Sequence, residues 1–148
     1  AFEKGFDGMF LDNIDNFTQF GPQKADKNEL ISFLKFINKK YPGKIFFQNA
    51  GLELLDQTNQ FIDGVVVESV ASSYTFKDKK YSLRDKKEFE NYIKRIKDLK
   101  SKFKTRFVLV EYADTKSLYD KISNRLNKHN LDYFIGKIDL QTIPNFKK

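Results

Sequence analysis

The sequence predicts an α/β fold in which helices cover a parallel β-sheet. Short strand signals and amphipathic helix signals alternate from one end of the chain to the other. The strand segments are apolar on both faces, which is typical of parallel strands buried between helices. A chain of 148 residues with 40% hydrophobic residues can bury a core within one domain. We therefore expect residues 1–148 to form a single domain of β/α units.

The first half of the chain contains three predicted strands with helices between them. Asp26 and Glu29 have the spacing of a capping box and are expected to begin a helix that ends at Pro42-Gly43. A short helix follows Gly51. The strands are predicted over residues 9–12, 44–49 and 65–68.

The second half begins with a predicted loop over residues 69–84. Asp85 and Glu88 repeat the capping-box spacing ahead of the next helix. A further helix carries Leu118, Ile122 and Leu126 on one face and ends near His129, where the helix dipole would favour a cationic, structural imidazole. The last two strands are predicted over residues 107–111 and 132–136.

The pattern Asp-Gly, three residues and an acid occurs twice, at residues 7–12 and 63–68. The Asp-Gly pairs are expected to form turns at strand entry. Asp12 and Glu68 would then end parallel strands, at the edge where active sites of such sheets form. Asp12 could instead cap a turn, and Glu68 could instead form a salt bridge. Because Glu68 follows three Val residues, we expect it to be buried, which would suit a general acid.

Other polar and aromatic residues follow the predicted strands and are candidates for substrate contacts. Neutral amides can bind sugar hydroxyls, and Tyr74 could stack on a sugar ring. Glu111 could bind a ligand or could equally be a structural partner of a neighbouring lysine. The candidate binding residues are Asn13, Asp15, Gln48, Asn49, Tyr74, Glu111 and Tyr112.

Composition excludes several classes of site. Without Cys and with one His, the chain offers no thiol chemistry, no Ser-His-Asp arrangement and no typical transition-metal site. We expect no cofactor and no metal, although an oxygen-ligand metal at Asp12 and Glu68 stays open. No apolar run is long enough to cross a membrane. The net charge of +7 raises nucleic acid as a partner, but the lysines are scattered and no nucleic-acid motif accompanies them, so none is expected.

Five parallel strands fit either an open doubly wound sheet or part of a (β/α)8 barrel. A complete barrel usually takes about 250 residues. We therefore expect a truncated chain, with unpaired sheet edges that a missing N-terminal half or a second copy would cover.

Four segments resemble glycoside hydrolase family 114, the group related to endo-α-1,4-polygalactosaminidase and sometimes labelled cysteinyl-tRNA synthetase-like. The resemblance runs along nearly the whole chain and is most specific in the first and third segments. The segments are Gly5–Asp15, Gln48–Gly51, Asp63–Val70 and Val110–Ala113.

The resemblance implies that this chain corresponds to strands four to eight of a (β/α)8 barrel, with the N-terminal part missing. It places the family's catalytic pair on Asp12 and Glu68, and it implies an enzyme that hydrolyses an α-linked galactosamine-type polysaccharide internally in its full-length form. It also implies a secreted or cell-envelope protein. A non-catalytic carbohydrate-binding barrel, or a remnant without activity, is the alternative.

Overall fold

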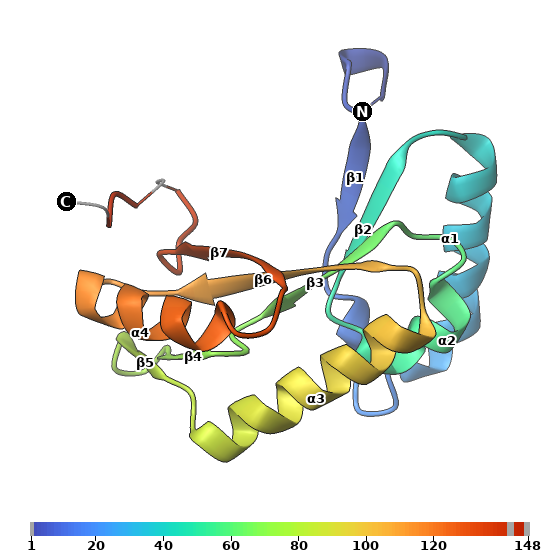
Figure 1. Ribbon diagram of the computed structural model, residues 1–148. Helices are drawn as coiled ribbons and strands as arrows, with labels where there is room; N and C mark the ends of the chain where they lie inside the picture. Colours follow the sequence, from blue (N-terminus) through green and yellow to red (C-terminus); the bar gives the residue numbers. More distant parts are fainter. Residues whose placement is uncertain (1, 142–143, 147–148) are drawn as a thin grey trace. The chain divides into compact units, whose positions relative to one another are not determined.

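The computed structural model describes residues 2–141 and 144–146, which fall into two compact units (Figure 1). The first unit comprises residues 1–66 and 103–106, and the second comprises residues 67–102 and 107–148. The five-stranded sheet has the order β1-β2-β3-β6-β7, and β1 pairs parallel with β2, β2 with β3, and β6 with β7. The predicted α/β class with a parallel sheet is confirmed.

In the first unit, the elements follow the predicted order closely. Its short 3-10 helices are η1 (Phe2–Lys4), η2 (Ile14–Phe17), η3 (Lys24–Asp26) and η4 (Leu52–Leu54), and η4 leads directly into α2. The capping box does not form, because the Asp26 side chain makes no cap hydrogen bond to α1. The main elements are β1 (Gly8–Leu11), α1 (Lys27–Lys40), β2 (Ile45–Asn49) and α2 (Leu55–Thr58), and β3 (Gly64–Glu68) begins here.

The Asp-Gly pairs are not turns, and this prediction is wrong. Gly8 and Gly64 are the first residues of β1 and β3, and neither has a positive φ. A Cβ at Gly8 would lie 2.2 Å from the Ile45 carbonyl oxygen, and one at Gly64 would lie 2.2 Å from the Phe47 ring. Glycine is therefore required by the close approach of the neighbouring strand. Asp63 assists strand pairing, because its carboxylate accepts a hydrogen bond from Phe46 N at 2.8 Å.

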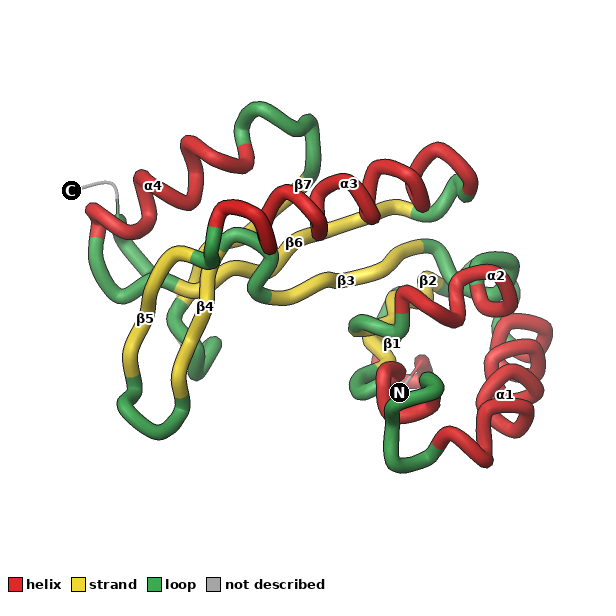
Figure 2. Tube along the Cα trace, turned by 90° about the horizontal axis from the view of Figure 1, so that it is seen from below, coloured by secondary structure: helices red, strands yellow, loops and turns green. Residues whose placement is uncertain are grey.

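The second unit contains a hairpin that the sequence did not reveal. Within the predicted loop, β4 (Ser72–Thr75) pairs antiparallel with β5 (Lys80–Leu83), with Tyr74 opposite Tyr81. Figure 2 shows this hairpin extending away from the strands of its own unit. The remaining elements are α3 (Lys86–Lys102), β6 (Arg106–Tyr112), α4 (Lys116–Leu126) and β7 (Asp132–Gly136).

Each unit has its own buried side chains. Branched aliphatic residues dominate both sets, as expected for strands and helix faces that exclude water. In the first unit the fully buried residues include Leu34, Phe46, Leu55 and Val65. In the second they include Ile96, Leu109, Ile122 and Leu126.

Candidate functional site

The residues that follow β1, β2 and β3 share a backbone feature. A polar side chain ends each strand region and a non-glycine residue with positive φ comes next: Asn13 at 58°, Ala50 at 57° and Ser69 at 55°. Left-handed conformations of such residues are costly and concentrate at functional sites. The carboxyl ends of these strands are therefore candidate positions, those of the first unit and of the second unit separately.

In the first unit, Asp12 and Asn49 contact each other. The strand register continues past Leu11 opposite Gln48, so Asp12 follows opposite Asn49. Asp12 Oδ1 accepts a hydrogen bond from Asn49 Nδ2 at 2.9 Å and from the Asn13 backbone N–H at 2.9 Å. Asp12 is exposed and Asn49 is half-buried, so a ligand can reach both.

The other predicted residues of the first unit have different positions. Gln48 is 0% exposed, and its Nε2 donates to the Ala50 carbonyl at 2.8 Å, so it holds the left-handed turn after β2. Its Oε1 is buried and has no hydrogen-bond partner among the described residues. Asp15 is exposed in η2. A cavity of about 700 Å³ lies in this unit, lined mainly by residues after β1 and β2 such as Gln19 and Gln57.

In the second unit, Glu68 is exposed at the end of β3, so the expectation that it is buried is wrong. The strand alternates, with Val67 buried and the next side chain outside. The Tyr112 hydroxyl donates a hydrogen bond to the Glu68 carboxylate, and Tyr112 itself is only 3% exposed. Glu68 is therefore accessible while one of its oxygens is held by a rigid donor.

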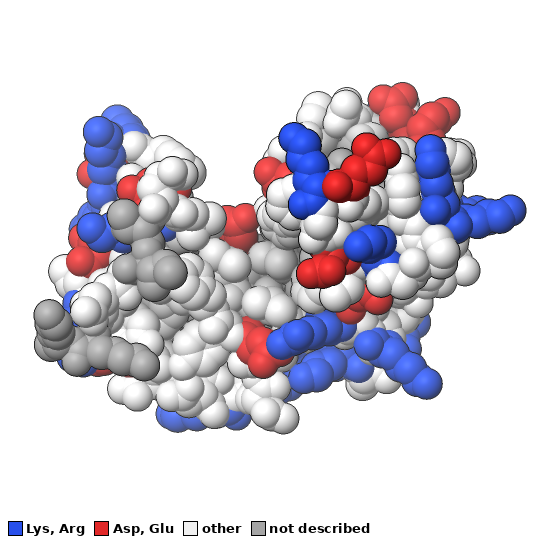
Figure 3. All heavy atoms as spheres, turned by 90° about the horizontal axis from the view of Figure 1, so that it is seen from above, with Lys and Arg blue, Asp and Glu red and all other residues white. Residues whose placement is uncertain are grey.

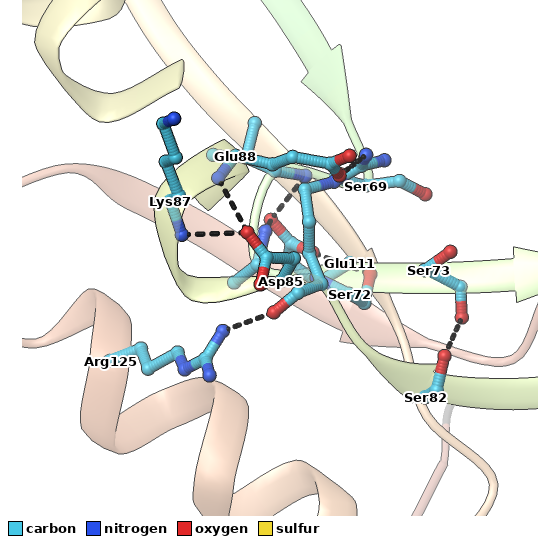
Figure 4. A network of polar contacts seen from close by, with 12 residues as sticks. Ser69, Ser72, Ser73, Ser82, Asp85, Lys87, Glu88, Glu111 and Arg125 are labelled. Atoms are coloured by element: carbon cyan, nitrogen blue, oxygen red, sulfur yellow. Dashed lines mark hydrogen bonds and ion pairs between the residues drawn. The ribbon is translucent and has the colours of Figure 1, made fainter. Parts of the chain in front are cut away.

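Glu111 is the buried strand-end acid, at 0% exposure. Its Oε1 accepts hydrogen bonds from the backbone N–H groups of Val70 (3.0 Å) and Ala71 (2.9 Å). Its Oε2 accepts from Ser72 N (2.7 Å) and Ser72 Oγ (2.5 Å). Burial raises the pKa of the Glu111 carboxyl, although the bonds from Ser72 and the amides act in the opposite direction. This geometry favours the structural alternative, with backbone amides in place of a lysine (Figure 4).

The hairpin carries a cluster of three aromatic rings. Tyr74 packs edge-on against Phe76 and Tyr81, with ring centroids 5.0 and 4.7 Å apart. Phe76 is 78% exposed and Tyr74 is half-buried. Beside β5 lies a cavity of about 400 Å³, lined by Tyr81, Ser82 and residues of the segment that leads into α4, including Asp114. Its volume is within the range of roughly 300–1,000 Å³ that is usual for ligand pockets.

Arg84, which the sequence did not single out, joins this hairpin to the segment after Glu68. Its Nε donates to the Ser69 carbonyl at 2.7 Å, and its own carbonyl accepts from Arg125 at 2.6 Å. An arginine at a loop end has no periodic signal, so the sequence could not identify this role. Ser72 was missed for the same reason.

The distribution of charged and metal-ligating side chains does not mark out a further binding site in the described residues (Figure 3). On the face drawn in Figure 3, Lys and Arg stand in separate groups interleaved with Asp and Glu. Within residues 2–141 and 144–146, no group of three or more His, Cys, Asp or Glu side chains is arranged to hold a metal ion. In the described part of the chain, no helix is both long and apolar enough to cross a membrane.

Comparisons with known proteins agree with the resemblance seen in the sequence. The model of glycoside-hydrolase family GH114 matches residues 1–146. The glycoside hydrolase domain of PelA from Pseudomonas aeruginosa is similar in structure, with a TM-score of 0.79 and 21% identity. The structure of a variant of that domain, in which one glutamate is changed to alanine, is similar with a TM-score of 0.77 and 20% sequence identity. Each comparison covers 95% of this chain and 57% of the solved chain. No curated protein sequence matches.

Proposed function

The chain belongs to glycoside-hydrolase family GH114, and from that premise we propose that it cleaves an α-linked galactosamine-type polysaccharide at internal bonds. The observation that carries this proposal is Glu68, a solvent-accessible carboxylic acid at the end of β3 whose carboxyl group the Tyr112 hydroxyl holds in place. An accessible, fixed carboxyl is what proton donation to a glycosidic oxygen requires. The chain spans 57% of the length of the solved domains it matches, so this activity is put forward as a proposal for the chain.

Glu68 is proposed as the general acid. Its proton passes to the glycosidic oxygen as the bond from that oxygen to the anomeric carbon breaks, and positive charge develops on the sugar ring. Asp12 is proposed as the second carboxylate, since it also ends a strand and is accessible. Hydrogen bonds from the Asn49 side chain and from the Asn13 backbone N–H to Oδ1 hold its carboxyl group in one orientation.

Asp12 could act in two ways, which differ in carboxyl separation. At about 5–5.5 Å from the acid, a carboxylate attacks the anomeric carbon and forms a glycosyl-enzyme that water then hydrolyses. At about 6.5–9.5 Å, it removes a proton from the attacking water. Proton NMR of the first product anomer distinguishes retention from inversion.

Tyr74 and the other rings of the hairpin are proposed to bind the sugar chain. Aromatic rings offer flat apolar faces, and the edge-on packing of Tyr74 against Phe76 and Tyr81 fixes their orientation before a ligand arrives. Asn13, Asp15 and Asn49 remain proposed binding residues at the end of β1 and β2. These same features support the second candidate, a carbohydrate-binding domain without turnover.

The test uses soluble α-1,4-linked galactosamine oligomers, with reducing ends measured over time and binding measured by calorimetry. We expect new reducing ends and products of intermediate length, and their loss in Asp12→Asn. Asp26→Asn, an exposed acid without a cap bond, is the matched control. Binding without new reducing ends would favour the carbohydrate-binding alternative, and neither binding nor cleavage would contradict both.

A further inference from the structure

The segment that follows Glu68 is fixed at nearly every backbone group. Ser69 has a φ of 55°, a conformation that persists only when its surroundings impose it. Ser69 N donates to the Val110 carbonyl at 2.9 Å, and Arg84 binds the carbonyls of both Ser69 and Ala71. The direction in which β3 presents Glu68 therefore depends on the path of residues 69–72.

The Glu111 carboxylate is the centre of this arrangement (Figure 4). Four donors from three consecutive residues converge on its two oxygens, at distances of 2.5–3.0 Å. Because three of these donors are backbone N–H groups, the carboxylate dictates the course of the main chain and not merely the position of one side chain.

Tyr112, the next residue, closes the connection to Glu68. Its backbone N–H donates to Ser72 Oγ at 3.0 Å, and its hydroxyl donates to the Glu68 carboxylate. Ser72 is thus bonded to Glu111 on one side and to Tyr112 on the other. The end of β6 therefore acts on Glu68 in two ways. Tyr112 binds the Glu68 carboxylate directly, and Glu111 fixes the residues that follow Glu68 in the chain.

A contribution to stability alone does not explain a carboxylate at this position. Removing a carboxylate from water is costly, and an apolar side chain of similar volume often serves stability as well or better. Direct contact with substrate does not explain it either, because Glu111 is 0% exposed. What the carboxylate does provide is a set of acceptors that fixes the backbone path of residues 70–72.

We propose that Glu111 is a positioning residue for the reacting acid: its carboxylate fixes residues 69–72 and, together with Tyr112, holds Glu68 in the orientation for proton transfer. The inference rests on the proposed function, since it takes Glu68 as that acid. It adds a residue that never touches the substrate and whose loss nevertheless slows the reaction.

The kinetic test is a double-mutant cycle on galactosamine oligomers with the chain, Glu111→Gln, Glu68→Gln and the double variant. Glu111→Gln places an amide NH₂ where N–H donors converge, so we expect kcat to fall roughly 10²-fold with KM changed by less than about twofold. In the Glu68→Gln background the same substitution should change residual hydrolysis little, because the group it positions is gone. Equal losses in both backgrounds would overturn the proposal. Glu90→Gln, on the exposed face of α3, is the control.

A structural readout covers the case in which Glu111→Gln folds poorly or the chain does not hydrolyse. Ser72→Ala removes one donor to Glu111 and the acceptor for Tyr112 N, so it perturbs the same arrangement more gently. We expect both variants to shift the Glu68 side-chain carboxyl carbon resonance and the amide resonances of residues 69–72, and Glu90→Gln to leave them unchanged. An unshifted Glu68 signal overturns the positioning role, whereas absent hydrolysis with a shifted signal overturns only the proposed function.

Discussion

His129 shows how a single side chain can contradict a rule that holds for its position. A helix C-terminus favours a cationic imidazole, yet the pKa of His129 is lowered from its ordinary value of 6.5 by desolvation and by the charges of Lys97 and Lys128. The ring lies 5.6 Å from Phe89, and its Nδ1 is buried without a hydrogen-bond partner in the described residues. These surroundings disfavour the cationic form that the helix end alone would favour, and the packing against Phe89 agrees with a structural role for His129.

His129 should make stability depend on pH in a defined window. Because the pKa of His129 is lower in the folded chain than its ordinary value of 6.5, the unfolded chain binds the proton more readily. The contribution of His129 to stability is therefore fully present above pH 6.5 and is lost as the pH falls through the folded pKa. Because the chain has one histidine, a single imidazole proton signal in NMR reports its pKa directly, and we expect a value below 6.5. A value above 6.5, or an identical pH dependence of unfolding in His129→Gln, would contradict this.

Asp85 is a residue whose charge supports the start of α3. Its carboxylate accepts from the backbone N–H groups of Lys87 at 2.8 Å and Glu88 at 3.1 Å, and the bond from Glu88 is the main cause of its lowered pKa. Here the capping position predicted from the sequence is confirmed, in contrast to Asp26. Local spacing suggested both, but only one side chain reaches the amides.

Asp85→Ala should lower the urea midpoint of unfolding at pH 7. A lowered folded pKa means that this stabilisation is present above the ordinary value of 3.8 and fades as the pH falls through the folded pKa. The difference between the two chains should therefore shrink in acid. Glu90→Ala on the same helix is the control, and a difference that stays constant down to pH 2 would indicate another cause.

At the scale of elements, α4 begins with an uncharged N-cap residue, Thr115. Thr115 accepts a hydrogen bond from Leu118 N at 3.3 Å, and its backbone is extended as an N-cap requires. We expect Thr115→Ala to lower the free energy of unfolding by about 1 kcal/mol. Ser117→Ala, an exposed change in the first turn of the same helix, should leave it unchanged within about 0.5 kcal/mol. Equal effects would show that α4 does not depend on this cap.

The hairpin is the element that should govern substrate binding. Tyr74 packs against the exposed ring of Phe76 and against Tyr81. Tyr74→Ala therefore removes one aromatic ring from the hairpin and takes away the support of the Phe76 ring. We expect Kd for galactosamine oligomers to rise about tenfold, which corresponds to roughly 1.4 kcal/mol. Thr75→Ala, an exposed neighbour on the same strand, is the matched control. Unchanged binding by Tyr74→Ala would remove the hairpin from the binding surface.

At the scale of the whole molecule, the sequence predicted the sheet well and the chemistry of its edge less well. Alternating apolar strands and helix faces report directly on burial, so the strands ending at Glu68 and Gly136 were identified within a residue or two. The hairpin over residues 72–83 has little alternation and depends on anchors far along the chain, above all Glu111. Glu68 and Glu111 look alike in sequence, each ending an apolar run. Only the packed structure separates the exposed acid from the buried one.

The most direct measurement of the central claim compares the rate of release of reducing ends from an α-1,4-linked galactosamine polymer by the chain, Glu68→Gln and Glu90→Gln. Glutamine keeps the shape of Glu68 but cannot donate the proton, so we expect a loss of about 10²-fold to 10⁴-fold. Glu90→Gln should match the unmodified chain. Hydrolysis by Glu68→Gln at the rate of the unmodified chain would contradict its role as the general acid.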